Sequence, residues 1–229
     1  MNTPHLRPKI AVVGAGWAGL SAAISLARRA DVTVFEAGRQ AGGRARTLAG
    51  SADGFSFLDN GQHILLGAYH GVLALMEHIG VAPETAFCCL PLRWYMYEGL
   101  QFQSTNFPSP LHILSGILRA KNISFSLKIK LLFDMAALQR YVRGKRADLP
   151  VAQWLRQRNV PRRLVAEFWQ PLVWGALNTP LEQASLRILC NVLSDGVWAD
   201  KSGSDYLLPK RDLGAIIAEP ALAKLKQFG

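Results

Sequence analysis

Three glycines near the start of the chain have the spacing that a phosphate group requires. Gly14, Gly16 and Gly19 follow directly on the apolar run of residues 10–13. Gly14 permits a tight turn, Gly16 has no Cβ to keep a pyrophosphate from the backbone, and Gly19 lets the next helix lie close to the sheet. The free N–H groups of that helix's first turn would face the negative charge. The pattern therefore predicts a strand buried on both faces, a glycine turn and a dinucleotide-binding helix.

An acidic residue ends the next expected strand. The helix is predicted over residues 17–29, and the strand that follows, over residues 32–36, closes on Glu36, which lies 22 residues after Gly14. A carboxylate at this place can accept hydrogen bonds from the ribose hydroxyls of adenosine, and about 20 residues is the spacing expected for it. Because the carboxylate would repel a 2′-phosphate, it favours FAD or NAD over NADP.

Two other interpretations compete for this segment. Glycine-rich turns also occur in ordinary strand–turn–helix units, and the chain has 20 glycines. Residues 10–27 are moreover 18 consecutive uncharged residues, which superficially resemble a signal peptide or a membrane span. The turn that the glycines force would break a spanning helix, so we expect a dinucleotide site and a cytoplasmic protein.

The cysteines fit a reducing compartment. Cys88, Cys89 and Cys190 are an odd number, and two of them are neighbours. This arrangement suggests neither a disulfide framework nor a metal site. We therefore expect reduced, partly buried thiols and no bound metal.

The segment that follows the acid distinguishes a flavin from a nicotinamide cofactor. Residues 36–47 read E-A-G-R-Q-A-G-G-R-A-R-T, which resembles the E-x-x-x-x-x-G-G-R-x-x-T segment of the FAD-dependent amine oxidase and phytoene desaturase superfamily. The resemblance implies that Gly42 and Gly43 let the backbone run beside FAD and that Arg44 serves its phosphate and flavin side. A guanidinium suits this role because it is a fixed fork of donors for phosphate oxygens. The alternative is that the arginines of this loop are solvated charges.

A second segment narrows the resemblance. Residues 57–69 read F-L-D-N-G-Q-H-I-L-L-G-A-Y and resemble the D-N-G-Q-H-x-x-x-G-x-Y stretch of the hydroxysqualene dehydroxylases of bacterial hopanoid biosynthesis. The resemblance implies that Gly61 and Gln62 contact the isoalloxazine edge. Together, the two segments and the glycine turn predict a cofactor site formed by Gly14, Gly16, Trp17, Ala18, Gly19, Glu36, Ala37, Gly42, Gly43, Arg44, Gly61 and Gln62.

His63 is the candidate catalytic residue of this second segment. An imidazole could protonate a departing hydroxyl near neutral pH. The alternative is that His63 packs near the flavin and positions a loop through its hydrogen bonds.

From about residue 84 onward the alternation of strands and helices gives way to another pattern. Residues 92–98 and 100–103 alternate like two strands around a turn at Gly99, which predicts a hairpin in a substrate domain. Helices are expected over residues 111–142, with an interruption near residues 121–124, and over residues 151–158, 161–174, 181–193 and 213–228.

Residues 111–146 are strongly basic. They carry eight Lys or Arg residues and a single acid, Asp134, among leucine, isoleucine and phenylalanine. Such a stretch can lie on an anionic membrane surface, with apolar stems inward and cationic heads among lipid phosphates; the alternative is a solvated basic face of a packed helix. The net charge of +10 agrees with both. No recognisable nucleic-acid motif accompanies the charge, so peripheral contact with the inner face of the cell membrane is the expected interaction and nucleic acid is not. The oligomeric state stays open.

The elements and the resemblance together imply the α/β fold class: a Rossmann-like FAD-binding domain with an incomplete parallel sheet, and an inserted, mainly helical substrate domain. We expect the FAD-binding part over residues 1–83, the substrate and membrane-facing domain over residues 84–205, and a return toward the FAD-binding domain over residues 206–229. Members of the superfamily are considerably longer, and their later strands and second flavin segment have no counterpart before the last residue. We therefore expect a truncated chain with an open sheet edge and an open flavin pocket.

The resemblance implies a reaction as well. In it, hydride from reduced FAD goes to the allylic carbon of hydroxysqualene, the hydroxyl leaves as water, and the product is squalene. The protein's part would be to orient this polyisoprenoid and to exclude water. Three alternatives stay open: a carotenoid-type polyisoprenoid desaturase, an amine oxidase, and an inactive dinucleotide-binding fragment.

Overall fold

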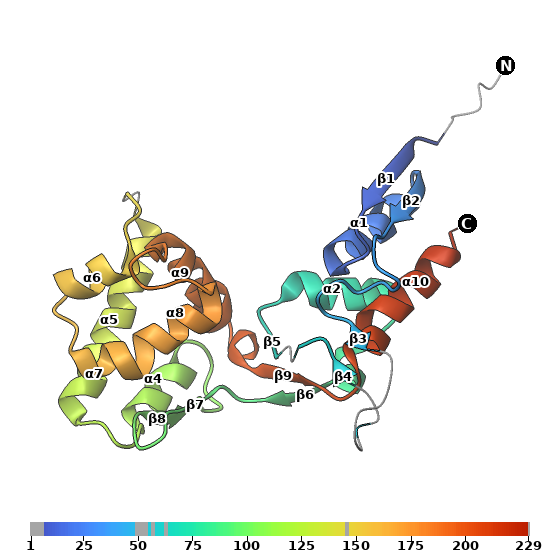
Figure 1. Ribbon diagram of the computed structural model, residues 1–229. Helices are drawn as coiled ribbons and strands as arrows, with labels where there is room; N and C mark the ends of the chain where they lie inside the picture. The colour runs from blue at the N-terminus through green and yellow to red at the C-terminus, as the bar shows by residue number, and fades with distance from the viewer. Residues whose placement is uncertain (1–6, 49–54, 56–57, 62–63, 145–146, 229) are drawn as a thin grey trace. The chain divides into compact units, whose positions relative to one another are not determined.

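The chain forms two compact units in the computed structural model, which describes residues 7–48, 55, 58–61, 64–144 and 147–228 (Figure 1). Unit 1 comprises Met1–Leu65, Tyr69–Cys89 and Leu207–Gly229, and unit 2 comprises Leu66–Ala68 and Leu90–Tyr206. Most of unit 2 is thus inserted between two segments of unit 1.

A parallel two-stranded sheet with a helix on one face begins unit 1. The strand β1 (Lys9–Val13) pairs with β2 (Asp31–Phe35), and α1 (Trp17–Ala27) connects them. Exposed and half-buried residues alternate along both strands; Val13 is 87% exposed and Phe35 is 55% exposed. The expectation that β1 is buried on both faces is therefore wrong, because α1 covers one face of the pair while these side chains on the other face meet solvent.

The boundaries of α1 differ slightly from those predicted. The helix ends at Ala27, not at residue 29, and Arg28 is its C-cap. Leu20, Ala23 and Ile24 form its buried stripe, so the helix packs through the face that a 3.6-residue period predicts.

The remaining elements of unit 1 come from two distant parts of the sequence. They are β3 (Thr47–Leu48), β4 (Leu58–Asp59), α2 (His70–Ile79), α3 (Pro83–Ala86), the π-helical turn η4 (Gly214–Ala218) and α10 (Glu219–Lys226). The last two form one helical segment, which confirms the helix predicted over residues 213–228 within about two residues at each end. In this unit α10 packs against α1 and α2. A three-stranded sheet has the order β5 (Leu65–Leu66), β9 (Tyr206–Pro209), β6 (Phe87–Leu90), and the chain passes between the units within these strands.

Unit 2 is mainly helical. Its hairpin of β7 (Arg93–Tyr95) and β8 (Gln101–Gln103) is antiparallel and confirms the predicted turn, although both strands are shorter than expected. The helices that follow are α4 (Leu111–Leu118), α5 (Phe125–Arg143), α6 (Val151–Gln157), α7 (Arg162–Leu164), η1 (Val165–Trp169), α8 (Gln170–Leu177), α9 (Leu186–Leu193), η2 (Ser194–Trp198) and η3 (Ser202–Ser204).

Two serine caps set helix boundaries in this unit. The Oγ of Ser124 accepts a hydrogen bond from the N–H of Leu127, so α5 begins where the predicted interruption ends. The Oγ of Ser185 accepts one from the N–H of Ile188 at 3.0 Å. The helix predicted over residues 181–193 therefore begins only at Leu186, because a cap residue lies outside the helix that it caps.

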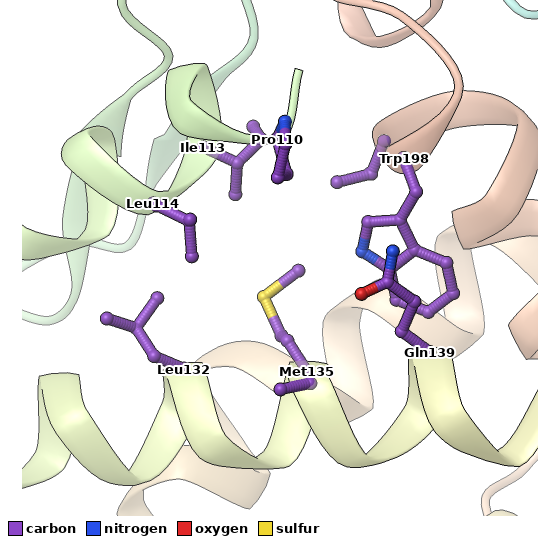
Figure 2. Close-up of a pocket in the computed structure, with 9 residues that line it drawn as sticks. Pro110, Ile113, Leu114, Leu132, Met135, Gln139 and Trp198 are labelled. Atoms are coloured by element: carbon purple, nitrogen blue, oxygen red, sulfur yellow. The ribbon is translucent and has the colours of Figure 1, made fainter.

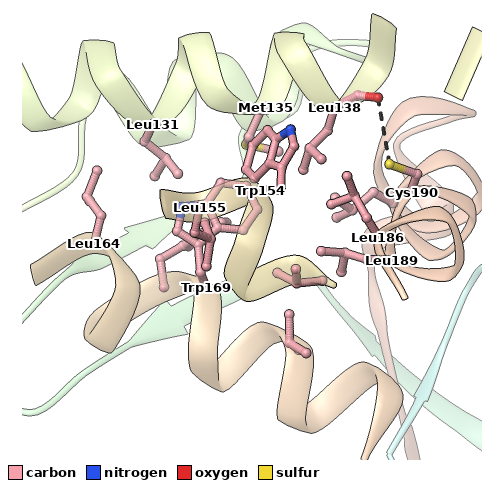
Figure 3. Close-up of a cluster of buried hydrophobic side chains, with 14 of the residues drawn as sticks. Leu131, Met135, Leu138, Trp154, Leu155, Leu164, Trp169, Leu186, Leu189 and Cys190 are labelled. Carbon is pink, nitrogen blue, oxygen red and sulfur yellow. Dashed lines mark hydrogen bonds between the residues drawn. The ribbon is translucent and has the colours of Figure 1, made fainter. Parts of the chain in front are cut away.

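Helices α4 to α9, the turn η1 and the strand β8 contribute buried side chains to the core of unit 2, part of which Figure 3 shows. The fully buried Trp169 packs edge-on against Trp154, with 5.7 Å between ring centroids, and against Phe168 at 5.0 Å. Asp134 is buried in the same unit, where its carboxylate binds Lys130 Nζ at 2.6 Å and Arg158 Nε at 2.7 Å. The single acid of the basic stretch is thus an internal partner of two cations.

None of the helices in the described ranges combines the length and apolarity needed to cross a bilayer.

Of the cysteines, Cys190 is buried, whereas Cys88 and Cys89 are exposed. The expectation of partly buried thiols is therefore wrong for the neighbouring pair, because β6 presents both of them at its surface.

Candidate functional site

The glycine turn after β1 has the conformation that its residue types allow. Gly14 has φ +98°, and its N–H donates to the carbonyl of Phe35 at 2.7 Å. A Cβ on Gly19 would lie 1.9 Å from the carbonyl oxygen of Gly14. The first glycine therefore makes the turn, and the third lets α1 approach it.

The second glycine segment lies against the first. Gly42 (φ +111°) donates from its N–H to the carbonyl of Ala15 at 2.8 Å and pairs with Gly16 in a parallel bridge. A Cβ on Gly43 would lie 3.1 Å from the Cα of Gly16. The two segments that the sequence singles out separately thus form one backbone surface without side chains.

This glycine surface borders a cavity of ≈ 730 Å³ in unit 1. A cavity of this size is within the usual range for cofactor sites, about 300–1,000 Å³. Six of the predicted cofactor residues line it: Gly16, Trp17, Ala18, Gly42, Gly43 and Arg44.

The residues around this cavity fit a diphosphate-bearing cofactor. A Cβ on Gly16 would meet nothing closer than the Cα of Gly43 at 3.9 Å, so the backbone there faces open space. Trp17 supplies a buried Nε1 that has no hydrogen-bond partner among the described residues. Arg44 is exposed beside it and brings a guanidinium. Bare backbone, an unused donor and a cation are what a diphosphate needs.

Glu36 holds the loops around this surface together. Its Oε2 accepts the N–H of Ala15 and its Oε1 that of Gly38, both at 2.7 Å. These backbone N–H groups, Gly38 first and then Ala15, hold the pKa of the Glu36 carboxyl below its ordinary value of 4.5. Each carboxylate oxygen of Glu36 can still accept another hydrogen bond, so a contact with the ribose is compatible with this geometry. That contact stays a prediction. The cofactor role of Ala37 also stays a prediction.

Other predicted residues shape the site or fall outside the description. Gly14, Gly19 and Glu36 do not line the cavity. Gly61 does not line it either; it has φ +102° and donates its N–H to the carbonyl of Asp59 at 2.7 Å. Gln62 and His63 lie outside the described residues, so their predicted contacts with the flavin stay predictions.

Sequence reasoning missed a polar cluster in unit 1. The Oγ1 of Thr47 lies 2.6 Å from Oδ1 of Asp212 and 3.0 Å from Oδ1 of Asp59, and it accepts the N–H of Gly214 at 3.0 Å. Asp59 also accepts the N–H of Leu213. Thr47 is the last residue of the first motif, and Asp59 is the first residue of the second. Their places in these motifs could therefore have marked them as site residues. Asp212 had no such signal, because its partner Thr47 is 165 residues away.

Sequence reasoning also gave no role to Ala45, Ile64, Leu65 and Tyr69, which complete the cavity lining. Tyr69 is the last residue of the second resembling segment.

Among the residues that the structure describes, no group of three or more His, Cys, Asp or Glu side chains is arranged to hold a metal ion.

Unit 2 has two apolar cavities of its own. One, of ≈ 140 Å³, lies between α4 and α5, with Leu114, Leu132 and Trp198 in its wall (Figure 2). The other, of ≈ 100 Å³, is lined by Trp94, Phe168 and Leu193, among others. Three residues, Ile113, Met135 and Val197, line both cavities.

Comparison with known proteins gives a family match and several relatives. Residues 17–203 match the family described as flavin containing amine oxidoreductase. The chain is 31% identical over 229 residues to hydroxysqualene dehydroxylase of Rhodopseudomonas palustris, with 95% of this chain and 50% of that protein covered. It is 40% identical over 229 residues to hydroxysqualene dehydroxylase of Sinorhizobium fredii, with 95% and 51% covered.

More distant similarities extend beyond the dehydroxylases. Zeta-carotene desaturase of Capsicum annuum is 20% identical over 216 residues, with 87% of this chain and 36% of that protein covered. The crystal structure of an oxidoreductase from Methanosarcina mazei superposes with a TM-score of 0.65 at 17% identity, covering 96% of this chain and 50% of that one. This likeness concerns the fold alone.

The chain spans about half the length of the dehydroxylases that it matches. The matches confirm the expected superfamily, the expected flavin and the mixed α/β class with a small parallel sheet. This chain belongs to the flavin containing amine oxidoreductase family.

Proposed function

We propose that this protein uses FAD to reduce hydroxysqualene to squalene. The observation that carries the proposal is the contact of the two glycine segments at one cavity, with Arg44 beside them. Similarity to two hydroxysqualene dehydroxylases supports the choice of substrate. Because the chain covers about half of each, the substrate is part of the proposal.

The residues of the site would each have a definite part. The backbone at Gly16 and Gly43 leaves room for the diphosphate, and Arg44 supplies its countercharge. The Nε1 of Trp17 is a hydrogen-bond donor that has no partner among the described residues. If bound in its reduced form, FAD would supply the hydride that replaces the allylic hydroxyl, and the flavin would become oxidised. The hydroxyl takes up a proton and leaves as water, and we assign this proton transfer to His63.

The apolar cavities of unit 2 are our proposed place for the hydrocarbon. Ile113, Met135 and Val197 line both cavities, and we propose that a side-chain movement there joins them into one apolar passage. We expect Met135→Trp to close this passage and to raise KM for the polyisoprenoid, whereas Met135→Leu, of similar volume, should behave as the wild type.

Peripheral membrane contact through residues 111–146 is also part of the proposal. Phe125 and Phe133 on α5 are 69% and 65% exposed, and the basic side chains Lys128 and Arg140 belong to the same helix. Exposed aromatic and cationic side chains on one helix suit an anionic bilayer surface. Flotation with vesicles of phosphatidylglycerol tests this contact, and we expect Phe125→Ser with Phe133→Ser to reduce it.

The cofactor is tested with Gly16→Ala. Gly16 has φ −70° and ψ 174°, which any residue adopts, and its nearest neighbour would lie 3.9 Å from the new methyl. The variant should therefore fold as the wild type does, yet place a methyl where the diphosphate lies. We expect its affinity for FAD, read from flavin absorbance after reconstitution, to fall about tenfold or more.

Gly71→Ala is the matched control, because a Cβ at Gly71 in α2 meets no atom within 4 Å. It should bind FAD as the wild type does. Equal affinity of the wild type and Gly16→Ala would contradict the site, as would a well-folded wild type that takes up no FAD; the latter outcome favours the inactive dinucleotide-binding fragment.

A carotenoid-type desaturase is the second candidate, and the similarity to zeta-carotene desaturase favours it. Product analysis separates the two: reduced flavin with hydroxysqualene should yield squalene, whereas oxidised flavin with phytoene should yield no desaturated product. Release of aldehyde from a primary amine would instead point to an amine oxidase.

A further inference from the structure

A basic cavity lies in unit 2, on elements that are not part of the flavin site. It has a volume of ≈ 470 Å³ and lies at the hairpin of β7 and β8 and the end of α4. Three cationic residues line it, Arg93, Arg119 and Lys121, and none of its lining residues is acidic. The remaining lining residues are polar, aromatic or glycine.

The hairpin separates this cavity from the apolar core. Trp94 lies opposite Phe102 in the strand register, and their stacked rings have centroids 6.2 Å apart. Phe102 is buried in the core of unit 2, and the indole N–H of Trp94 donates to the carbonyl of Glu167. Since side chains alternate across a strand, the next pair, Arg93 and Gln103, stands on the other face. There Arg93 Nη2 donates to Gln103 Oε1 at 3.2 Å.

The cations at this cavity lack the acidic partners that other cations of the unit have. Lys130 and Arg158 bind Asp134. In the described ranges, no ion pair joins Arg93, Arg119 or Lys121 to an acid. Lys121 is nevertheless anchored, because its N–H donates to the carbonyl of Gln101 at 2.8 Å.

Ser104 is the second, independent indication of a ligand. It lines the cavity, is only 5% exposed, and its Oγ has no hydrogen-bond partner among the described residues. Its backbone is fixed by a hydrogen bond from its N–H to the carbonyl of Leu92 at 2.9 Å. Helix α4 approaches closely, since a Cβ on Gly116 would lie 2.4 Å from the carbonyl of Gln103. A buried hydroxyl without a partner is unfavourable, and an acceptor bound in the cavity would remove that cost.

We propose that this cavity binds a phosphate group. Two guanidinium groups offer forked donors for phosphate oxygens, an ammonium adds a point charge, and a hydroxyl completes the donor set. The volume also admits a diphosphate or a phosphorylated head group. The proposal is independent of the flavin site, and its test requires neither FAD nor turnover.

Calorimetric titration of the whole chain with inorganic pyrophosphate tests the site. We expect saturable binding, and we expect the double variant Arg119→Gln with Lys121→Gln to weaken it about tenfold or more. The matched control is Lys224→Gln with Lys226→Gln, which removes the same charge from α10 of unit 1 and should change the affinity less than twofold. Absence of saturable binding, or an equal loss in both variants, would overturn the proposal.

Ser104→Ala separates a ligand contact from a structural one. If the hydroxyl donates to phosphate, the variant binds pyrophosphate several-fold more weakly but unfolds at the same or a higher temperature. Unchanged affinity would show that the Ser104 hydroxyl does not contact the phosphate, and would contradict the proposed arrangement of donors in the cavity.

Vesicles distinguish the source of the phosphate. Vesicles of phosphatidylglycerol and of phosphatidylcholine are each mixed with the protein, and pyrophosphate is then added as a competitor. Release of bound vesicles by pyrophosphate indicates a lipid head group in the cavity. Pyrophosphate binding that leaves vesicle association unchanged indicates a free phosphate compound.

Discussion

The two units bury their apolar residues to different degrees. Unit 2 buries Trp169 in a large continuous core, and its fully buried acid Asp134 has two cationic partners. Unit 1 has a smaller core, and its β1–β2 sheet leaves Val13 and Phe35 largely exposed. Yet the β1 sequence is as apolar as a strand with two covered faces. The comparison shows that apolar composition makes a strand, whereas its burial depends on which other elements pack over it.

The largest effect is expected in the core of unit 2. Trp169→Ala should lower the free energy of unfolding by about 3–5 kcal/mol, because it leaves a cavity beside Trp154 and Phe168. Denaturant unfolding measures the loss. Trp169→Phe is the control and should cost less, since the indole N–H that it removes has no partner among the described residues.

Alkylation of Cys190 measures how readily the core of unit 2 opens. Burial raises the pKa of the Cys190 thiol to about 11, so alkylation at pH 8 should be slow until unit 2 opens, while the exposed Cys88 reacts at once. Trp169→Ala should speed the alkylation of Cys190 and leave that of Cys88 unchanged. Rapid alkylation of Cys190 in the wild type would refute a closed core in unit 2.

In unit 1 the most sensitive position is expected to be Gly19. Gly19→Val should destabilise the unit by about 3 kcal/mol, because its Cβ would lie 1.9 Å from a backbone oxygen that cannot move cheaply. Gly19→Val should lose FAD binding because unit 1 is destabilised, whereas Gly16→Ala should weaken FAD binding while its stability stays that of the wild type. Thermal unfolding of both variants checks this, and a Gly19→Val protein as stable as the wild type would show that α1 is not held against the turn.

A smaller effect is expected at Asp134 in unit 2. Asp134→Ala removes the partner of two cations and should cost about 2 kcal/mol, less than the 3–5 kcal/mol typical of a broken buried pair. The reason is that Lys130 and Arg158 are partly exposed and can turn to water. Unfolding in urea measures the loss, and the same cost in 1 M salt as in 0.1 M salt would contradict an electrostatic origin.

The smallest effect concerns acid and Glu36. Since its pKa is lowered in the folded chain, the stability that it contributes is fully present above pH 4.5 and is lost as the pH falls through the folded-state value below 4.5. In Glu36→Gln, the free energy of unfolding of unit 1 should therefore decrease less steeply than in the wild type as the pH falls below 4.5. Urea unfolding of both proteins between pH 3 and pH 6 tests this, and parallel pH profiles would show that the carboxylate is not linked to folding.

Local sequence was sufficient for the elements and for part of the site. The glycine spacing predicted the turn at Gly14 and the approach at Gly19, because φ preferences and a missing Cβ act within a few residues. The alternation of residues around Gly99 predicted the hairpin, because successive side chains of a strand point to opposite faces. The helix predicted from residue 181 began too early, because an apolar period cannot show which serine will act as the cap.

The tertiary structure decided which of these segments meet. Sequence by itself determined two glycine segments and an acid suited to FAD, and the family match agrees with that. It could not place Gly42 beside Gly16, join Thr47 to Asp212, or gather Arg93, Arg119 and Ser104 around one cavity. Conformational preferences act between neighbours in the chain, whereas these contacts form only when packing closes long loops and sets the strand register.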